Sequence, residues 1–146
     1  MSKHRYQIIS EFLDYIQSVR RYSVHTIRSY QHDLHDYAIF CREYDIEKDL
    51  KDLDQTAIKC YLQHLSQKGL SAKTLARRLA SIKSLYKYML INKVVKVNIA
   101  LSVKTPKMKK ELPHYLSLKE AEEILTLPVG DDVKALRERL MLELFY

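Results

Sequence analysis

Helix-breaking residues are almost absent from the first hundred positions of this chain. The 146 residues include two glycines and three prolines, and Gly69 is the only one of these five within positions 1–100. Glycine and proline are the residues that most often interrupt helices and mark loops. Apolar residues make up 47% of the chain, which excludes intrinsic disorder. We therefore predict an all-α fold.

Apolar residues recur at helical spacing in four successive segments of the predicted first domain, residues 1–100. We expect these helices over about residues 6–20, 23–42, 54–69 and from 71 to at least 89. Ser23 and Ser71 are good N-cap residues for the second and fourth helices, and Gly69 suits the position that follows the third. The first domain is therefore expected to be a bundle of four helices.

Positive charge is concentrated in one segment of the chain. The net charge is +7, and from Lys68 to Lys110 there are 12 lysines and arginines but no Asp or Glu. Ordinary solvated helix faces mix both signs, so such a block indicates a polyanion as partner, either nucleic acid or anionic lipid. The alternative, which stays open, is that a lysine-rich surface only keeps the protein in solution.

One face of the fourth predicted helix combines cations with hydroxyl groups. At 100° per residue this face lies opposite the apolar stripe, and we expect it to be exposed. Its residues are Lys73, Arg77, Ser81, Ser84, Lys87 and Tyr88. Cations displace the counterions of a phosphate backbone and hydroxyl groups add directional hydrogen bonds, so this face suits DNA.

The chain changes character after residue 100. Residues 101–113 contain two prolines and a run of lysines without apolar periodicity, which predicts an exposed basic linker. Beyond it, Ser117 and Glu120 form a capping box for a short helix through Leu125. Asp131 and Asp132 precede a further helix that is expected to run to the last residue. A segment as short as 114–146 cannot enclose a core of its own. We expect it to be an incomplete part of a second domain.

The sequence offers no convincing catalytic or metal site. His32 and His35 are three residues apart, but no third ligand is evident, and Cys41 and Cys60 match no metal-binding spacing. Most tyrosines lie on the apolar stripes, and there is no glycine-rich phosphate loop. We predict no cofactor, no metal and no small-molecule substrate. No apolar run could span a membrane and no secretory signal is present, so we expect a cytoplasmic protein without a membrane partner.

Two strings resemble a known family closely. They are YSxxTIxxYxxDLxxY from Tyr22 to Tyr37 and GLSAKTLARRLASIKSLY from Gly69 to Tyr86. Both resemble the N-terminal, core-binding domain of Xer-type tyrosine recombinases and phage-type integrases. Downstream, residues 98–100, 112–117 and 137–146 are similar to that family's linker and to the start of its catalytic domain, so the resemblance covers nearly the whole chain.

The resemblance implies a SAM-like four-helix domain that forms half of a clamp around duplex DNA, with its second and fourth helices against the major groove. The matching residues are Ser23, Thr26 and Arg28 on the second helix and Lys73, Arg77, Ser81, Ser84 and Lys87 on the fourth. We expect the basic linker to add Lys104 and Lys107 to these DNA-binding residues. The implied partner is a recombinase half-site in duplex DNA.

The family's activity is a second implication of the resemblance. Its nucleophilic tyrosine forms a covalent 3′-phosphotyrosyl link to DNA without a metal or cofactor. The catalytic residues follow the helix that Arg137–Tyr146 resembles, so none can be carried over, and we expect this chain to bind duplex DNA without cleaving it. Ile99 also replaces a proline that is usual in the family.

Two alternatives remain open at the level of sequence. The chain could be a truncated paralogue, a protein-interaction module that docks on full-length recombinase protomers, or a generic helical bundle with a basic surface.

Overall fold

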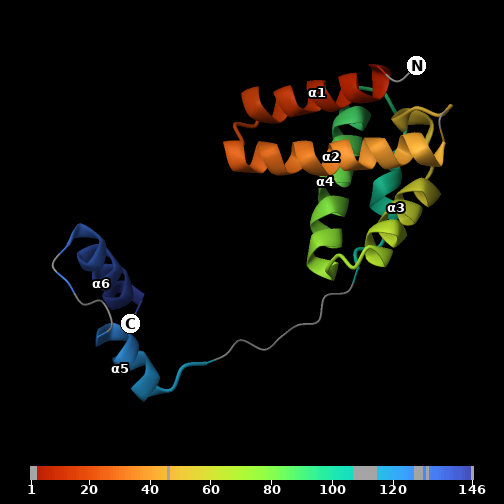
Figure 1. The fold of residues 1–146 in the computed structure, drawn as a ribbon. Coiled ribbons are helices and arrows are strands. Elements are labelled where there is room, and N and C mark those ends of the chain that lie inside the picture. Colours follow the sequence, from red (N-terminus) through yellow and green to blue (C-terminus); the bar gives the residue numbers. More distant parts are fainter. Residues whose placement is uncertain (1–2, 46, 107–114, 127–129, 131, 146) are drawn as a thin grey trace. The chain divides into compact units, whose positions relative to one another are not determined.

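A computed structural model describes residues 3–45, 47–106, 115–126, 130 and 132–145 of the protein. The chain divides into two compact units, Met1–Met108 and Lys109–Tyr146, and each is treated by itself. All regular elements in the described ranges are helices (Figure 1), which confirms the all-α prediction.

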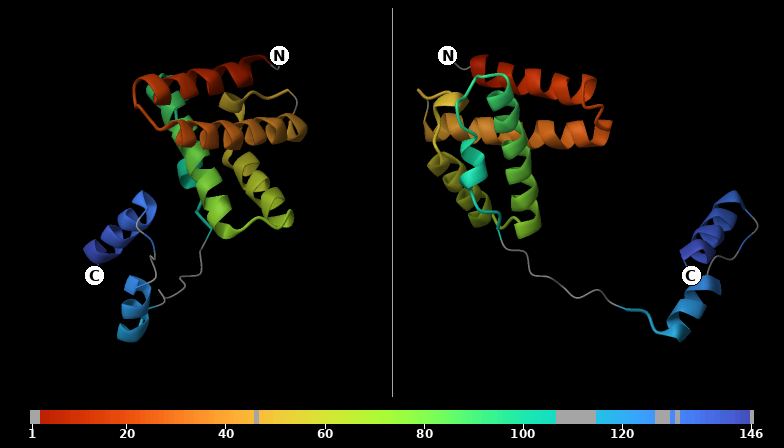
Figure 2. Two further views of the ribbon diagram at one scale, coloured as in Figure 1. Left: turned by 60° about the vertical axis from the view of Figure 1, so that its left-hand side comes forward. Right: turned by 180° about the vertical axis from the view of Figure 1, so that it is seen from behind.

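The first unit contains the four predicted helices and two short 3₁₀ helices. The long helices are α1 (Lys3–Ser18), α2 (Val24–Tyr44), α3 (Gln55–Gln67) and α4 (Ala72–Ile91), and the short ones are η1 (Leu50–Asp52) and η2 (Ile99–Ser102). The helices α1 and α2 lie side by side, and α4 crosses both of them with α3 at its flank (Figures 1 and 2).

Side chains placed just before each helix explain where the helices begin. The Ser23 hydroxyl accepts the Thr26 backbone N–H at 3.3 Å at the start of α2, and Ser71 caps α4 in the same way. Asp54 caps α3 by accepting the N–H groups of two residues. Gly69 adopts a left-handed φ of +80° between α3 and α4, a conformation that glycine reaches without steric cost. The two caps predicted for α2 and α4 are confirmed.

The apolar stripes of the four helices meet in one core. Leu34, Ile58, Leu79 and Ile82 are fully buried there. Each side chain of this size contributes about 1.5–3 kcal/mol when it is removed from water. The polar tip of the buried Tyr86 is also satisfied, because its hydroxyl donates to the Leu50 carbonyl at 2.7 Å. This packing fixes the orientation of α2 against α4.

The first unit continues beyond residue 100, where the sequence suggested that the linker begins. Asn98 caps η2 by accepting the Ala100 N–H at 3.1 Å, and its amide donates to the Lys83 carbonyl at 3.2 Å. Ala100 and Val103 are buried against the core. The expected exposed linker over 101–113 is therefore incorrect at Val103, because η2 folds this segment back onto the bundle. Residues 107–113 of that linker lie outside the described residues.

The second unit contains α5 (Leu118–Thr126) and α6 (Val133–Phe145). The predicted capping box is present, since Glu120 accepts the Ser117 N–H at 2.8 Å and the Ser117 hydroxyl accepts the Glu120 N–H at 3.3 Å. Neither helix has a buried residue within its described part. Leu144 and Phe145 are 82% and 90% exposed.

Candidate nucleic-acid interface

A shallow groove runs between α2 and α4 on the first unit. Its volume is about 340 Å³, and it is lined by His25, Thr26, Ser29, Tyr30, Arg77, Ala80 and Ser81. Two of the lining residues carry ionisable nitrogen groups, several carry hydroxyl groups, and none is an acid. A groove of this composition favours an anionic ligand.

Exposed cations extend this groove along α4. Lys73, Arg77 and Lys87 are exposed, and Ser84 between them is half-buried. Their spacing places them on one face of the helix, as the sequence predicted. The distance along the axis from Lys73 to Lys87 is about 21 Å at 1.5 Å per residue. We call these four residues and the groove residues of α2 the α2–α4 face.

Of the other sequence-predicted residues, Thr26 lines the groove and Ser23 precedes α2 as its N-cap. Ser23 and Thr26 stand at the first turn of α2, where their hydroxyl oxygens are 2.9 Å apart. Arg28 is exposed on the same helix, and Lys104 is exposed after η2. Lys107 lies outside the described residues.

Ser81 does not belong to the exposed face, contrary to the expectation from the helical periodicity. It is only 3% exposed, and its hydroxyl donates to Asp33 Oδ2 at 2.9 Å. The reason is that α2 packs against α4 at this level and covers the serine. Tyr88 also differs from the expectation, because its ring packs against Phe12 and Tyr15 at centroid distances of 5.5 and 5.2 Å.

A buried carboxylate organises the centre of the α2–α4 contact. Asp33 is 1% exposed, and Oδ2 of this residue accepts from the guanidinium of Arg77 as well as from Ser81. Burial of an unpaired carboxylate is costly, so the pairing with Arg77 stabilises this arrangement. Arg77 is therefore partly exposed, with 49% of its side chain accessible to solvent, while its guanidinium pairs with the buried Asp33.

The neighbouring Arg78 is structural. Although the sequence places it in the basic block, it is 7% exposed, and it donates to Asp36 Oδ2 at 2.6 Å and to the Tyr61 hydroxyl at 2.8 Å. Burial tends to lower the pKa of Arg78, but the hydrogen bonds to Tyr61 and Asp36 outweigh it and raise the pKa. Burial also raises the pKa of Tyr61 to about 12, so its hydroxyl stays protonated. Arg78 thus joins α2, α3 and α4 and offers no charge to a ligand.

Three polar residues that line the groove, His25, Ser29 and Tyr30, were not among the predicted DNA-binding residues. The helical projection of α2 places His25 and Ser29 opposite its apolar stripe but Tyr30 on the stripe itself, so periodicity did not identify the three as one site. The Asp33 network, which consists of Asp33 with its partners Arg77 and Ser81, was not predicted for a different reason. Its partners come from separate helices, and the periodicity of one helix does not report them.

The described residues hold no group of three or more side chains suited to a metal ion. His32 instead lies beside carboxylates of its own helix, 3.9 Å from Asp36. No helix in the described ranges is long and apolar enough to cross a membrane.

Comparisons with known proteins agree with this architecture. Residues 9–93, which run from within α1 to just past the end of α4, match the family "Phage integrase, N-terminal SAM-like domain". The tyrosine recombinase XerC of Pelotomaculum thermopropionicum is 34% identical over 97% of this chain and 47% of its own length. XerC of Syntrophus aciditrophicus is 33% identical over 96% of the chain and 47% of its own length.

The tyrosine recombinase XerD of Halalkalibacterium halodurans is 32% identical over 94% of this chain and 46% of its own length. The chain thus spans about half the length of the curated relatives it matches. No solved structure matches it. On the family match and these relatives, the chain belongs to the phage integrase N-terminal SAM-like domain family and resembles Xer-type tyrosine recombinases along nearly its whole length.

Proposed function

We propose that this chain binds duplex DNA through the α2–α4 face, as the DNA-binding part of a tyrosine recombinase. The observation that carries the proposal is the groove between α2 and α4, which has no acidic lining residue and is flanked by the exposed cations Lys73 and Lys87. The relatives of this chain, named tyrosine recombinases XerC and XerD, support the same function.

The geometry suits the major groove. B-DNA's major groove is about 12 Å wide and admits an α-helix. A helix with cations over about 21 Å of its length can contact phosphates on both walls of that groove. Ser23, Thr26 and Arg28 on α2 would contact the backbone beside α4, and Lys104 and Lys107 would add charge. Ser81 supports this face from within by its bond to Asp33.

Within this proposal, residues 1–146 bind duplex DNA but do not cleave it. The hydroxyl groups of the α2–α4 face bond other hydroxyl groups or a backbone carbonyl, whereas covalent catalysis requires a nucleophile beside a base. Incubation with a nicked suicide duplex should give no covalent protein–DNA product on a denaturing gel. A trapped adduct would overturn this part of the proposal. We also propose that the protein acts in the cytoplasm and that further recombinase protomers on the same DNA are its protein partners.

The test is fluorescence anisotropy with a labelled duplex of about 30 base pairs, titrated across a range of salt concentrations. For B-DNA, the slope of log K against log salt is about −0.9 for each phosphate that the protein neutralises. We expect a wild-type slope that corresponds to several phosphates. A Lys73→Glu and Lys87→Glu double variant should bind at least about tenfold more weakly with a shallower slope, because two phosphate contacts become repulsive.

The matched control reverses two exposed lysines away from this face, Lys51 and Lys59, with the same change of net charge. If the two double variants weaken binding equally, the basic surface acts only through its total charge and the generic helical bundle is the better account. If the wild-type protein fails to bind duplex at low salt, docking on recombinase protomers becomes the leading function. Arg77 is left unchanged, because a carboxylate there would face the buried Asp33 and destabilise the fold.

A further inference from the structure

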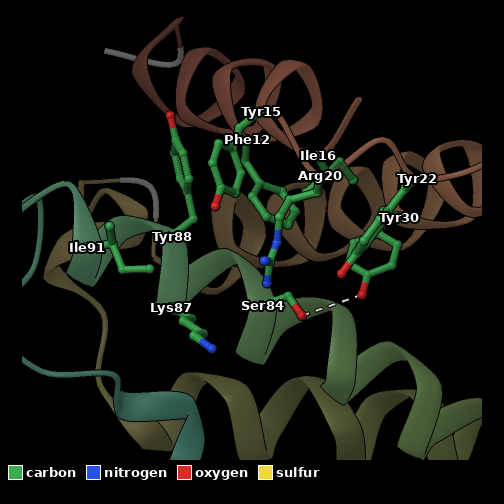
Figure 3. A pocket seen from close by; sticks show the side chains of 10 residues that line it. All are labelled: Phe12, Tyr15, Ile16, Arg20, Tyr22, Tyr30, Ser84, Lys87, Tyr88 and Ile91. Atoms are coloured by element: carbon green, nitrogen blue, oxygen red, sulfur yellow. Dashed lines mark hydrogen bonds between the residues drawn. The ribbon is translucent and has the colours of Figure 1, made fainter. Parts of the chain in front are cut away.

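A second concave site lies at the corner where α1 turns into α2, beside the C-terminal half of α4 (Figure 3). We call it the corner pocket, and it has a volume of about 200 Å³. Phe12, Tyr15, Ile16, Arg20, Tyr22, Tyr30, Ser84, Lys87, Tyr88 and Ile91 line it. Three of these residues, Tyr30, Ser84 and Lys87, belong to the α2–α4 face, whereas Arg20 was not among the predicted DNA-binding residues.

The polar groups of the corner pocket are those that bind a phosphate. Arg20 and Lys87 are both exposed, and no Asp or Glu lines the pocket. In Figure 3 the Arg20 side chain extends from the α1–α2 corner toward α4, where Ser84 lies. The hydroxyl groups of Tyr30 and Ser84 are 3.4 Å apart. Arginine and lysine with adjacent hydroxyl groups supply charge-assisted and directional hydrogen bonds to phosphate oxygens.

The backbone at this corner holds Arg20 in place. Arg21 adopts a left-handed φ of +52°, which is uncommon for a residue other than glycine and costs about 1–2 kcal/mol. On either side of it, the Arg20 N–H donates to the Tyr15 carbonyl at 3.2 Å and the Tyr22 N–H donates to the Ile16 carbonyl at 3.0 Å. These bonds fix the sharp turn from which Arg20 and Tyr22 both reach the pocket.

Aromatic rings line the pocket on both sides of Arg20 (Figure 3). Tyr88 packs against Phe12 at a centroid distance of 5.5 Å, and Tyr22 packs edge-on against Tyr30 at 6.2 Å. Burial, together with the nearby Glu11 and Asp14, raises the pKa of Tyr88, so this ring carries no negative charge near neutral pH. An aromatic lining of this kind excludes water and strengthens an ion pair formed beside it.

We propose that the corner pocket binds one backbone phosphate of duplex DNA, held by Arg20, Lys87 and the Ser84 hydroxyl. This inference rests on the proposed function, because it adds a phosphate contact to the same DNA-binding surface. Lys87 lies ten residues beyond Arg77, about 15 Å along α4. That distance is close to the width of a major groove, about 12 Å. The corner pocket therefore contacts the wall of the groove opposite the one that Lys73 and Arg77 contact.

The test is the salt dependence of duplex binding by the whole chain with single changes at Arg20. Arg20→Gln should make the slope of log K against log salt shallower by about 0.9, the value for one phosphate contact. Arg20→Lys keeps the charge and should restore most of the slope. The matched control is Arg42→Gln, which removes another exposed arginine, from the last turn of α2. Circular dichroism should show the same unfolding temperature for all of these variants.

Each outcome has a separate meaning for the two proposals. If the wild type binds duplex with a steep slope but Arg20→Gln matches the Arg42→Gln control, the corner pocket is not a DNA phosphate site and the proposed function survives. If the wild type does not bind duplex at all, both proposals fail. Inorganic phosphate serves as the second probe, and the Arg20 Nε–H resonance in NMR spectra reports its binding. A shift of that resonance by inorganic phosphate, with an unchanged salt slope in Arg20→Gln, would identify a site for free anions and overturn the DNA assignment.

Discussion

Helices in both units of this protein have N-capping side chains, but their apolar residues differ greatly in burial. In the first unit Leu79 of α4 is fully buried, whereas in the second unit Leu140 of α6 is 60% exposed. Both helices begin at a capping side chain, Ser71 for α4 and Asp132 for α6. The difference shows that local signals such as an N-cap are enough to determine where a helix forms. Burial of its apolar residues also requires a second apolar surface that packs against them.

The second unit relies on local interactions within its described residues. On α6, Lys134 lies 3.9 Å from Glu138 and Arg139 lies 3.5 Å from Glu143, both at the favourable spacing of four residues. Such exposed pairs contribute only about 0.2–0.5 kcal/mol each. In the first unit, by contrast, the buried core and the Asp33 network connect helices that are distant in sequence.

The largest predicted effect is the contrast between two leucine truncations. Leu79→Ala should lower the free energy of unfolding of the first unit by about 2–5 kcal/mol, because it leaves a cavity in the core. Leu140→Ala should change it by less than about 0.5 kcal/mol, because that side chain is exposed. Urea unfolding of the whole chain, followed by near-ultraviolet circular dichroism of the buried tyrosines, measures both. Equal losses would show that α6 packs against the first unit.

A slightly smaller loss is expected from Asp33→Asn. Removal of one partner of a buried ion pair costs about 3–5 kcal/mol, and we expect about 3 kcal/mol because Asp36 still pairs with Arg78. The change also removes the carboxylate partner of Arg77, which should strengthen the contact of its guanidinium with DNA phosphate. The control is Asp14→Asn on the exposed side of α1, which should have almost no effect. A fully stable Asp33→Asn protein would contradict the structural role of the network.

Alkaline pH should destabilise the first unit selectively. Burial raises the pKa of the Cys41 thiol and of the Tyr61 hydroxyl to about 12, above the values of 9.0 and 10.0 that these groups have in an unfolded chain. The neutral forms therefore favour the folded state. Their contribution is complete below about pH 9 and is lost as the pH rises toward 12, by about 1.4 kcal/mol per pH unit for each group.

Urea unfolding at pH 8, 10 and 11, with tyrosinate absorbance recorded in parallel, tests this prediction. Cys41→Ala removes the thiol and should shift the onset of destabilisation from about pH 9 to about pH 10. Stability that stays constant up to pH 11 would show that these groups are open to water.

The smallest predicted effects concern the two serine caps. Ser71→Ala should destabilise the first unit by about 1 kcal/mol, because the Thr74 N–H loses its acceptor. Ser117→Ala removes the corresponding cap of α5 but should leave the unfolding of the first unit unchanged. Urea unfolding measures the first effect, and amide hydrogen exchange in α5 measures the second. A loss of first-unit stability in Ser117→Ala would mean that the two units unfold together.

Sequence reasoning worked where the physical cause is local. The caps at Ser23, Ser71 and Ser117 each depend on a hydrogen bond to a backbone N–H three residues later, so their residue types are sufficient to predict them. The apolar stripe of α4 was predicted for the same reason, and Leu79 and Ile82 of this stripe are fully buried. Each of these features depends only on residues within or next to one helix.

Sequence reasoning failed where a second element decides the outcome. Ser81 lies on the polar side of α4 by periodicity, but Asp33 and α2 cover it. Val103 has no helical periodicity around it, yet η2 returns it to the core. Arg20 lies outside every predicted stripe, and only the left-handed turn at Arg21 brings it beside Ser84. In each case the missing information is the packing of one element against another.

The most direct test of the central claim, that the α2–α4 face binds duplex DNA, is NMR titration of the whole chain with a duplex of about 30 base pairs. The account predicts that the largest amide shifts occur around Thr26, Arg77 and Lys87, with little change around Lys51 and Lys59. Dominant shifts around Lys51 and Lys59, or no shifts at low salt, would contradict it.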